Sequence, residues 1–283
     1  MANLKEIRTR ISSVSSTMQI TSAMKMVSAA KLKKAQDRVT GFKPYAEKLQ
    51  SVISDLSGDS EGIVYAEQRD EKRVLIIVVS SNKGLCGAFN ANSVKRAIVI
   101  AEENKDKTIE FACIGKKAGE LIRYKGLNVV KSYNEVYDDL TFDNVAVVAD
   151  EIMKQFIDGD YDKVYLVYNS FKNAASQILM AEQFLPIVAP EVEGTQSNDY
   201  IYEPNKQEIL EHVIPIALKT QVYKAVIDSF ASEHGARMTA MHKATDNAND
   251  LVKELTLTYN KARQAAITNE ILEIVGGAEA LSN

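Results

Sequence analysis

A glycine-containing loop is the segment of this sequence with the clearest chemical potential. Lys83-Gly84-Leu85-Cys86-Gly87 follows an apolar run and precedes a helical pattern, where dinucleotide-binding folds hold phosphate on backbone amides. Its spacing is GxxG, however, whereas the dinucleotide fingerprint is GxGxxG. Gly115-Lys116-Lys117 likewise lacks the upstream glycine of a phosphate-binding P-loop. These mismatches favour tight strand-to-helix turns, with nucleotide binding as the alternative.

The other reactive side chains form no recognisable constellation. Cys86 lies where a helix N-terminus would lower a thiol pKa, but no histidine lies nearby in sequence to activate it, so we expect a structural thiol. His234 and His242 are about 12 Å apart along a helix, too far to share a metal ion. His212 stands alone, and Asp138-Asp139 is interpreted as a solvated pair. The sequence therefore predicts no catalytic group, cofactor site or metal site.

Composition and charge restrict the classes of partner. The 283 residues are 46% hydrophobic and 25% charged, with a net charge of −4. Residues 1–56 carry ten Lys/Arg and four Asp/Glu, but no interleaved aromatics, which favours an acidic protein partner over nucleic acid; a merely solvated helix flank is the alternative. The longest apolar run, Val74–Val79, is far shorter than a membrane span, and no secretory segment opens the chain. We expect a soluble intracellular protein without bilayer insertion.

The C-terminal stretch predicts a helix too long for a compact domain. Residues 217–281 contain no proline, and at about 1.5 Å per residue they would extend on the order of 95 Å. Pro215 either lies in the first turn or bends this helix. A coiled-coil seam with steps of three and four runs through Met241, Ala244, Ala248, Leu251, Leu255, Thr258, Ala262, Ala265, Asn269 and Leu272.

The N-terminal stretch predicts a second long helix over residues 3–56. Gly41 and Pro44 are candidate points of a kink. Two long seams at opposite ends of one chain are most simply buried against each other, as an antiparallel pair. The N-terminal seam runs through Leu4, Ile7, Ile11, Val14, Met18, Thr21, Met24, Val27, Leu32, Ala35, Val39 and Phe42.

Between the helices, strand and helix patterns alternate. Amphipathic helices are expected near residues 90–104 and 116–125, and a third one has Thr141 as its N-cap. The alternation indicates a doubly wound α/β domain. Predicted strands are residues 74–79, 109–114, 128–131 and 164–168, then an antiparallel strand at 177–185 and an edge strand at 200–202.

The predicted fold is thus α/β: a long antiparallel coiled coil of the N- and C-terminal helices with an inserted Rossmann-like α/β domain. The predicted domains are the N-terminal helix at residues 1–56, the α/β domain at 70–204 and the C-terminal helix at 205–283.

Four motifs in the same order resemble the gamma subunit of bacterial F-type ATP synthases over essentially the whole chain. They are IRTRISSVSSTMQITSAMKMVSAAKLKKAQDRV, SSNKGLCGAFN, SEHGARMTAMHKATDNANDL and LTYNKARQAAITNEILEIVGGAEAL, the last being the most specific. The resemblance implies a central-stalk rotor that performs no bond chemistry. It implies as partners a hexamer of alpha and beta subunits, an epsilon subunit and a c ring. It further implies a peripheral protein on the cytoplasmic side of the bacterial inner membrane.

The resemblance also implies roles for individual residues. Met24 and Lys25 match positions where the shaft meets the acidic lever of a beta subunit, with Arg237 near them on the opposing helix. If Met24 faces Arg237, Met1 lies near Asn260, and the helix beyond that point has no intrachain partner. Arg263, Gln264, Thr268 and Glu270 match positions that contact the hexamer, while Tyr200 and Glu203 match the foot that touches the c ring.

Two other classes stay open as alternatives. A nucleotide-binding α/β enzyme accounts for the middle of the chain only. A coiled-coil adaptor accounts for the terminal helices but not for the matched motifs.

Overall fold

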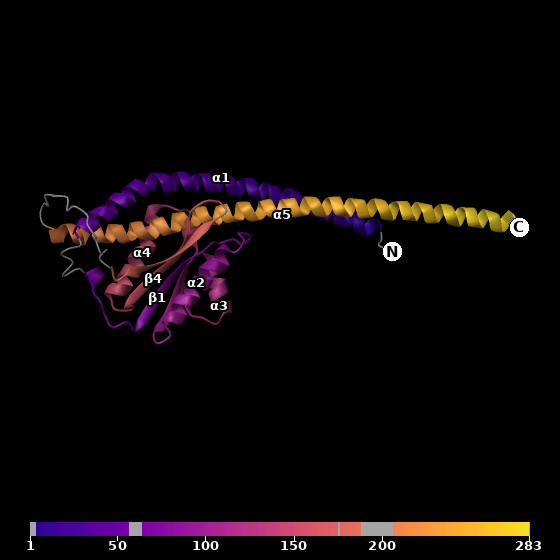
Figure 1. The fold of residues 1–283 in the computed structure, drawn as a ribbon. Helices are drawn as coiled ribbons and strands as arrows, with labels where there is room; N and C mark the ends of the chain where they lie inside the picture. Colours follow the sequence, from indigo (N-terminus) through magenta and orange to yellow (C-terminus); the bar gives the residue numbers. More distant parts are fainter. Residues whose placement is uncertain (1–3, 57–63, 175, 188–205, 283) are drawn as a thin grey trace. The chain divides into compact units, whose positions relative to one another are not determined.

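A computed structural model describes residues 4–56, 64–174, 176–187 and 206–282 (Figure 1). The chain divides into two compact units, of which one is Ser28–Arg237 and the other combines Met1–Val27 with Met238–Asn283. Helices α1 (Leu4–Leu56) and α5 (Lys206–Ser282) each contribute to both units.

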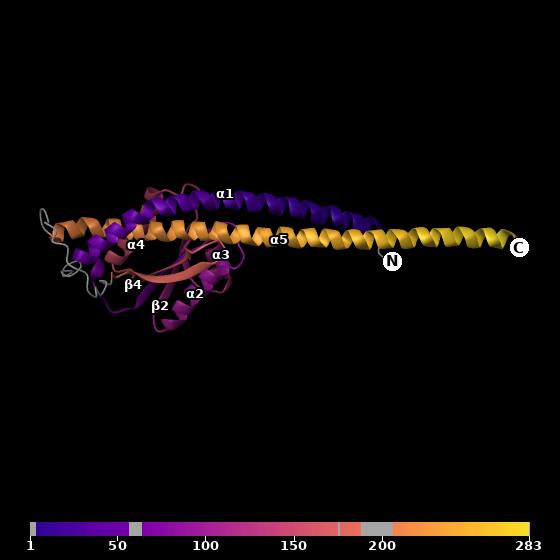
Figure 2. The same cartoon turned by 45° about the horizontal axis from the view of Figure 1, so that its top comes forward.

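The unit Ser28–Arg237 is built on a five-stranded sheet of order β3-β2-β1-β4-β5 (Figures 1 and 2). Strand β1 pairs in parallel with β2 and β4, β2 pairs in parallel with β3, and β5 is antiparallel to β4. The predicted fold class is confirmed. The strands are β1 (Arg73–Val79), β2 (Thr108–Ile114), β3 (Val129–Tyr133), β4 (Lys163–Phe171) and β5 (Gln177–Leu185).

Helices cover both faces of this sheet. Alternate residues of β1 point to opposite faces, so Val74, Ile76 and Val78 pack with α2 and α3, whereas Leu75, Ile77 and Val79 pack with α4 and α5. Burial on both faces explains why β1 is an uninterrupted apolar run. The helices are α2 (Phe89–Glu103), α3 (Lys116–Tyr124) and α4 (Phe142–Ile157), with short 3-10 turns η2 (Val64–Ala66) and η3 (Glu135–Tyr137).

Local signals placed some boundaries well and others less well. The Thr141 side chain accepts a hydrogen bond from the backbone N–H of Asn144, which confirms the predicted N-cap of α4. Strand β3 continues to Tyr133, beyond the predicted end at 131. The predicted edge strand at 200–202 lies outside the described residues, and the three predicted domain ranges stay a prediction.

Both terminal helices contain a proline without being interrupted. Helix α5 begins at Lys206, so Pro215 is in its interior, and the prediction of a first-turn position is wrong. Pro44 similarly lies inside α1. An interior proline deprives the carbonyl four residues earlier of its N–H partner. Those carbonyls belong to Thr40 and Glu211, which occupy exposed positions where water is available.

In the other unit, α1 and α5 run antiparallel (Figures 1 and 2). The hydroxyls of Thr21 and Thr245 share a hydrogen bond of 2.9 Å, which fixes the register. Residues Ile7, Met241 and Ala248 are buried, as predicted for the seam. The seam prediction is wrong at Val27, which is 58% exposed.

The C-terminal part of the predicted seam is also displaced. Thr258, Ala265 and Asn269 are exposed, and Tyr259 and Ala266 are half-buried in their place, whereas the predicted seam residue Ala262 is half-buried as expected. An unsupercoiled helix drifts about 20° per heptad relative to a strict seven-residue repeat, so the covered face moves along the sequence.

The paired segment of α1 is shorter than the segment of α5 beside it. In this unit α1 contributes residues 4–27, whereas α5 contributes residues 238–282, a rise of about 67 Å. The Thr21–Thr245 register brings Leu4 level with Ala262, and all residues from Ile267 to Ala278 are exposed. The prediction of an uncovered helix end is confirmed, starting a few residues later than Asn260.

We expect Gly115→Ala to destabilise the α/β domain by roughly 3 kcal/mol. Gly115 has φ of 101°, and a Cβ there would lie 2.2 Å from the carbonyl oxygen of Ser80. Urea unfolding followed by circular dichroism measures the loss. Gly84→Ala is the matched control, because its Cβ would meet no atom within 4 Å; equal losses in both variants would contradict the explanation.

Candidate functional site

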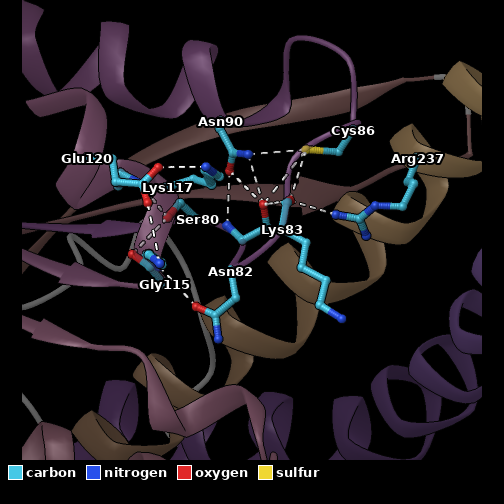
Figure 3. A network of polar contacts seen from close by, with 12 residues as sticks. Ser80, Asn82, Lys83, Cys86, Asn90, Gly115, Lys117, Glu120 and Arg237 are labelled. Atoms are coloured by element: carbon cyan, nitrogen blue, oxygen red, sulfur yellow. Dashed lines mark hydrogen bonds and ion pairs between the residues drawn. The ribbon is translucent and has the colours of Figure 1, made fainter. Parts of the chain in front are cut away.

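The loop between β1 and α2 meets the N-terminus of α3 (Figure 3). The backbone N–H of Lys116 donates to Asn82 Oδ1 at 3.0 Å, and that of Ala118 donates to Ser80 Oγ at 2.9 Å. The N–H of Lys117 donates to the carbonyl of Ser81. A phosphate at this helix end would use the same amides. Since they already have partners in the protein, the geometry at the start of α3 supports a tight turn rather than a nucleotide site.

The two cysteines lie in the interior of the α/β domain. Cys86 is 1% exposed, and burial raises the pKa of its thiol. The Asn90 side chain donates to its Sγ at 3.2 Å. Burial also raises the pKa of Cys113 to about 12. A thiol that stays protonated is a poor nucleophile, which agrees with the structural role predicted for Cys86.

The most connected side chain in this region is Arg237, on α5 (Figure 3). Its Nη2 donates to the carbonyls of Lys83 and Gly84 at 2.8 and 3.2 Å, and its Nε donates to Gly84 as well. Its Nη1 binds Glu233 Oε1 at 2.6 Å and approaches His234 Nδ1 at 3.3 Å. A guanidinium has five N–H donors, and here each has an acceptor.

Burial shifts the pKa values of both partners of Arg237. Glu233 is 6% exposed, and burial raises the pKa of its carboxyl group against the opposing attraction of Arg237. Burial lowers the pKa of His234 to about 3, and the charges of Arg237 and Lys31 act in the same direction. Because a guanidinium only donates, His234 Nδ1 is the acceptor and the proton lies on Nε2. Within the described residues Nε2 is buried without a hydrogen-bond partner.

The tip of the loop is held in an unusual conformation. Leu85 has φ of 61°, a left-handed backbone that leucine rarely adopts, and its side chain is 64% exposed. The adjacent Lys83 carbonyl accepts from Ser81 Oγ at 2.6 Å in addition to Arg237. Such strain persists only where surrounding contacts impose it.

The predicted interface residues fall in different environments. Met24 and Lys25 are half-buried on α1, whereas Arg237 is 7% exposed in the other compact unit. Tyr200 and Glu203 lie outside the described residues. Arg263, Gln264, Thr268 and Glu270 all lie exposed on the C-terminal part of α5.

Sequence reasoning missed the buried pair of Glu233 and Arg237. Their spacing of four residues in a helix was the available signal, but most such pairs lie on the surface. Among the described residues there is no cluster of three or more potential metal ligands. Nor does any described helix combine the length and apolarity that a membrane span requires.

Comparison with known proteins defines the class. The sequence model of the ATP synthase family matches residues 3–281. The same fold occurs in a chain of the Euglena gracilis mitochondrial ATP synthase, in a structure of its OSCP, F1 and c-ring. The two chains align with a TM-score of 0.71 at 22% identity. The alignment covers 98% of this chain and 94% of that one. A chain from the central stalk and c-ring of the Tetrahymena thermophila mitochondrial enzyme aligns at 25% identity with a TM-score of 0.61, covering 80% of this chain and 99% of that one.

Curated relatives narrow the class. The ATP synthase gamma chain of Christiangramia forsetii is 58% identical, and the alignment covers 100% of both chains. The chain therefore belongs to the ATP synthase gamma-chain family.

We expect the free energy of unfolding to fall by about 2 kcal/mol between pH 7 and pH 5 because of His234. Below its ordinary pKa of 6.5 the unfolded chain binds a proton that the folded chain, with a pKa of about 3, does not. Stability is therefore lost as the pH drops. Denaturant unfolding at the two pH values measures this loss.

Replacing His234 by Gln should reduce the pH dependence by that amount. His212→Gln is the control, since His212 is exposed on the same helix. If both variants kept the full pH dependence of the parent, His234 would not be its source.

Proposed function

We propose that this chain is the central-stalk rotor subunit of a proton-translocating F-type ATP synthase. The observation that carries the proposal is the bare end of α5, where Ile271, Leu272 and Ile274 are 55%, 63% and 71% exposed. An exposed apolar stripe of this kind indicates a surface that another protein covers. The family membership and the likeness to a chain of the Tetrahymena central stalk and c-ring support the ATP synthase hexamer as that partner.

In this proposal the chain couples two sites without catalysing a reaction. The c ring turns the α/β domain, and α5 turns inside the hexamer of alpha and beta subunits. The changing face of α5 biases each beta subunit in turn towards a different conformation, and so drives binding, synthesis and release of ATP. This is a mechanical form of allosteric coupling, because one ligand site is linked to another through alternative interface contacts.

The proposed contact residues are those that the family resemblance implies. Met24 and Lys25 contact the acidic lever of a beta subunit, and Tyr200 and Glu203 contact the c ring. Arg237 belongs to the same proposed interface, although a bond to another subunit would compete with its present acceptors. The exposed α5 residues Arg263, Gln264, Thr268 and Glu270 contact the hexamer.

The location follows from the partners. A subunit that binds the c ring and an epsilon subunit is a peripheral protein on the cytoplasmic side of the bacterial inner membrane. Attachment through other subunits requires neither bilayer insertion nor nucleic-acid binding.

Mixing the purified chain with alpha and beta subunits tests the proposal. We expect one complex on gel filtration, and ATP hydrolysis well above that of the alpha–beta mixture. If the chain elutes alone and hydrolysis is unchanged, the proposed function is wrong.

Deleting residues 276–283 should weaken assembly or coupling without unfolding the α/β domain. The deleted segment belongs to the unit formed by α1 and the end of α5, whereas the sheet belongs to Ser28–Arg237. Thermal melting by circular dichroism and the stimulation of hydrolysis are the two measurements. Removal of residues 282–283 alone is the control; a melted α/β domain in the longer deletion would count against the explanation.

A further inference from the structure

Helix α5 is attached to the α/β domain by a series of polar contacts. Lys219 pairs with Asp150 of α4, Asp228 accepts from Ser170 of β4, and Ser232 donates to the carbonyl of Asn169. Arg237 makes the last of these contacts, to the carbonyls of Lys83 and Gly84, and is the final residue of its compact unit. Among these contacts, Arg237 makes the one that lies farthest along α5 within this unit.

The contact is built for rigidity. Arg237 is 7% exposed, all five of its N–H groups have acceptors, and three of its hydrogen bonds go to two consecutive carbonyls (Figure 3). A planar guanidinium fixes direction as well as distance, which a lysine ammonium does not. Main-chain carbonyls also cannot rotate away as side chains can. Figure 3 shows the guanidinium reaching from α5 directly to this loop.

The loop depends on this contact in turn. The strained Leu85 follows the two carbonyls that Arg237 holds, and the other hydrogen bonds to the Lys83 carbonyl come from the same loop, from Ser81 and Cys86. Ser81 and Asn82 connect the start of the loop to α2 and α3, whereas Arg237 connects the Lys83 and Gly84 carbonyls to α5.

We propose that Arg237, with Glu233 as its counter-ion, is a positioning residue that locks the Lys83–Leu85 loop to α5 and carries torque between the α/β domain and the helix. This inference rests on the proposed rotor function. The same role explains why Glu233 and Arg237 form a buried ion pair at this position. Apolar side chains would hold the helix against the domain without fixing its rotation.

Two variants distinguish a role in transmitting torque from a contribution to the folding stability of the chain alone. Glu233→Gln leaves Arg237 on the carbonyls but removes its counter-ion. The double variant Glu233→Gln/Arg237→Gln removes the hydrogen bonds from the guanidinium to the Lys83 and Gly84 carbonyls without leaving a buried unpaired charge. Lys224→Gln, at an exposed position of α5, is the control for replacing a charged side chain of this helix by glutamine.

The variants are compared in the complete complex in vesicles, by the ratio of ATP-driven proton pumping to ATP hydrolysis. We expect the double variant to lower this ratio about two-fold or more. Glu233→Gln should keep the ratio even where it lowers the melting temperature, and Lys224→Gln should change neither quantity. In the isolated chain, the amides of Phe89 and Lys117, which donate to the loop carbonyls of Cys86 and Ser81, should exchange about ten-fold or more faster in the double variant.

Three results would overturn the inference. They are an unchanged ratio in the double variant, an equal fall in both variants, or unchanged amide exchange at Phe89 and Lys117. The exchange measurement decides even if the double variant does not assemble. Failure of the proposed function is distinguishable, because then the unmodified chain itself would neither join the hexamer nor stimulate its hydrolysis.

Discussion

An apolar helix end that the chain cannot cover is the constraint on which the rest of this structure depends. In the unit that pairs α1 with the end of α5, the α1 segment has little more than half the residues of the α5 segment. The shorter helix can bury only the part of α5 that lies beside it. Five apolar side chains, Ile267, Ile271, Leu272, Ile274 and Val275, remain between 48% and 71% exposed. Burial of that surface in a partner is a driving force for assembly.

The attachment of α5 to the α/β domain has a different character. Apolar residues such as Leu218, Val222 and Val226 bury one side of the helix against the sheet. Non-directional burial holds the helix close but resists rotation weakly. The buried pair of Glu233 and Arg237 adds directional bonds to main-chain atoms of the loop after β1. One helix thus combines a fixed end in the domain with an exposed end that is available to other subunits.

Sequence reasoning recovered the parts of the fold that have local periodicity. The apolar run at β1, the Thr141 cap and most of the two helix seams follow from residue type and spacing. It failed where tertiary contacts decide: α5 continues past Pro215 because its apolar residues, including Leu210 and Ile214, pack on the domain. Beyond Leu255 the covered face departs from the predicted seam at Thr258, Ala265 and Asn269, since an unsupercoiled helix does not keep a strict seven-residue repeat. The Arg237 contact joins residues 153 positions apart, and no local pattern encodes it.

Direct observation of rotation tests the rotor proposal most stringently. Tyr124 is 91% exposed on α3, so Tyr124→Cys offers a handle for a bead, while both native cysteines are buried. With the hexamer fixed to a surface, the rotor proposal predicts that ATP drives unidirectional turning of the bead, with three resting positions per revolution. A bead that stays still, or only fluctuates, while the same complexes hydrolyse ATP would contradict it.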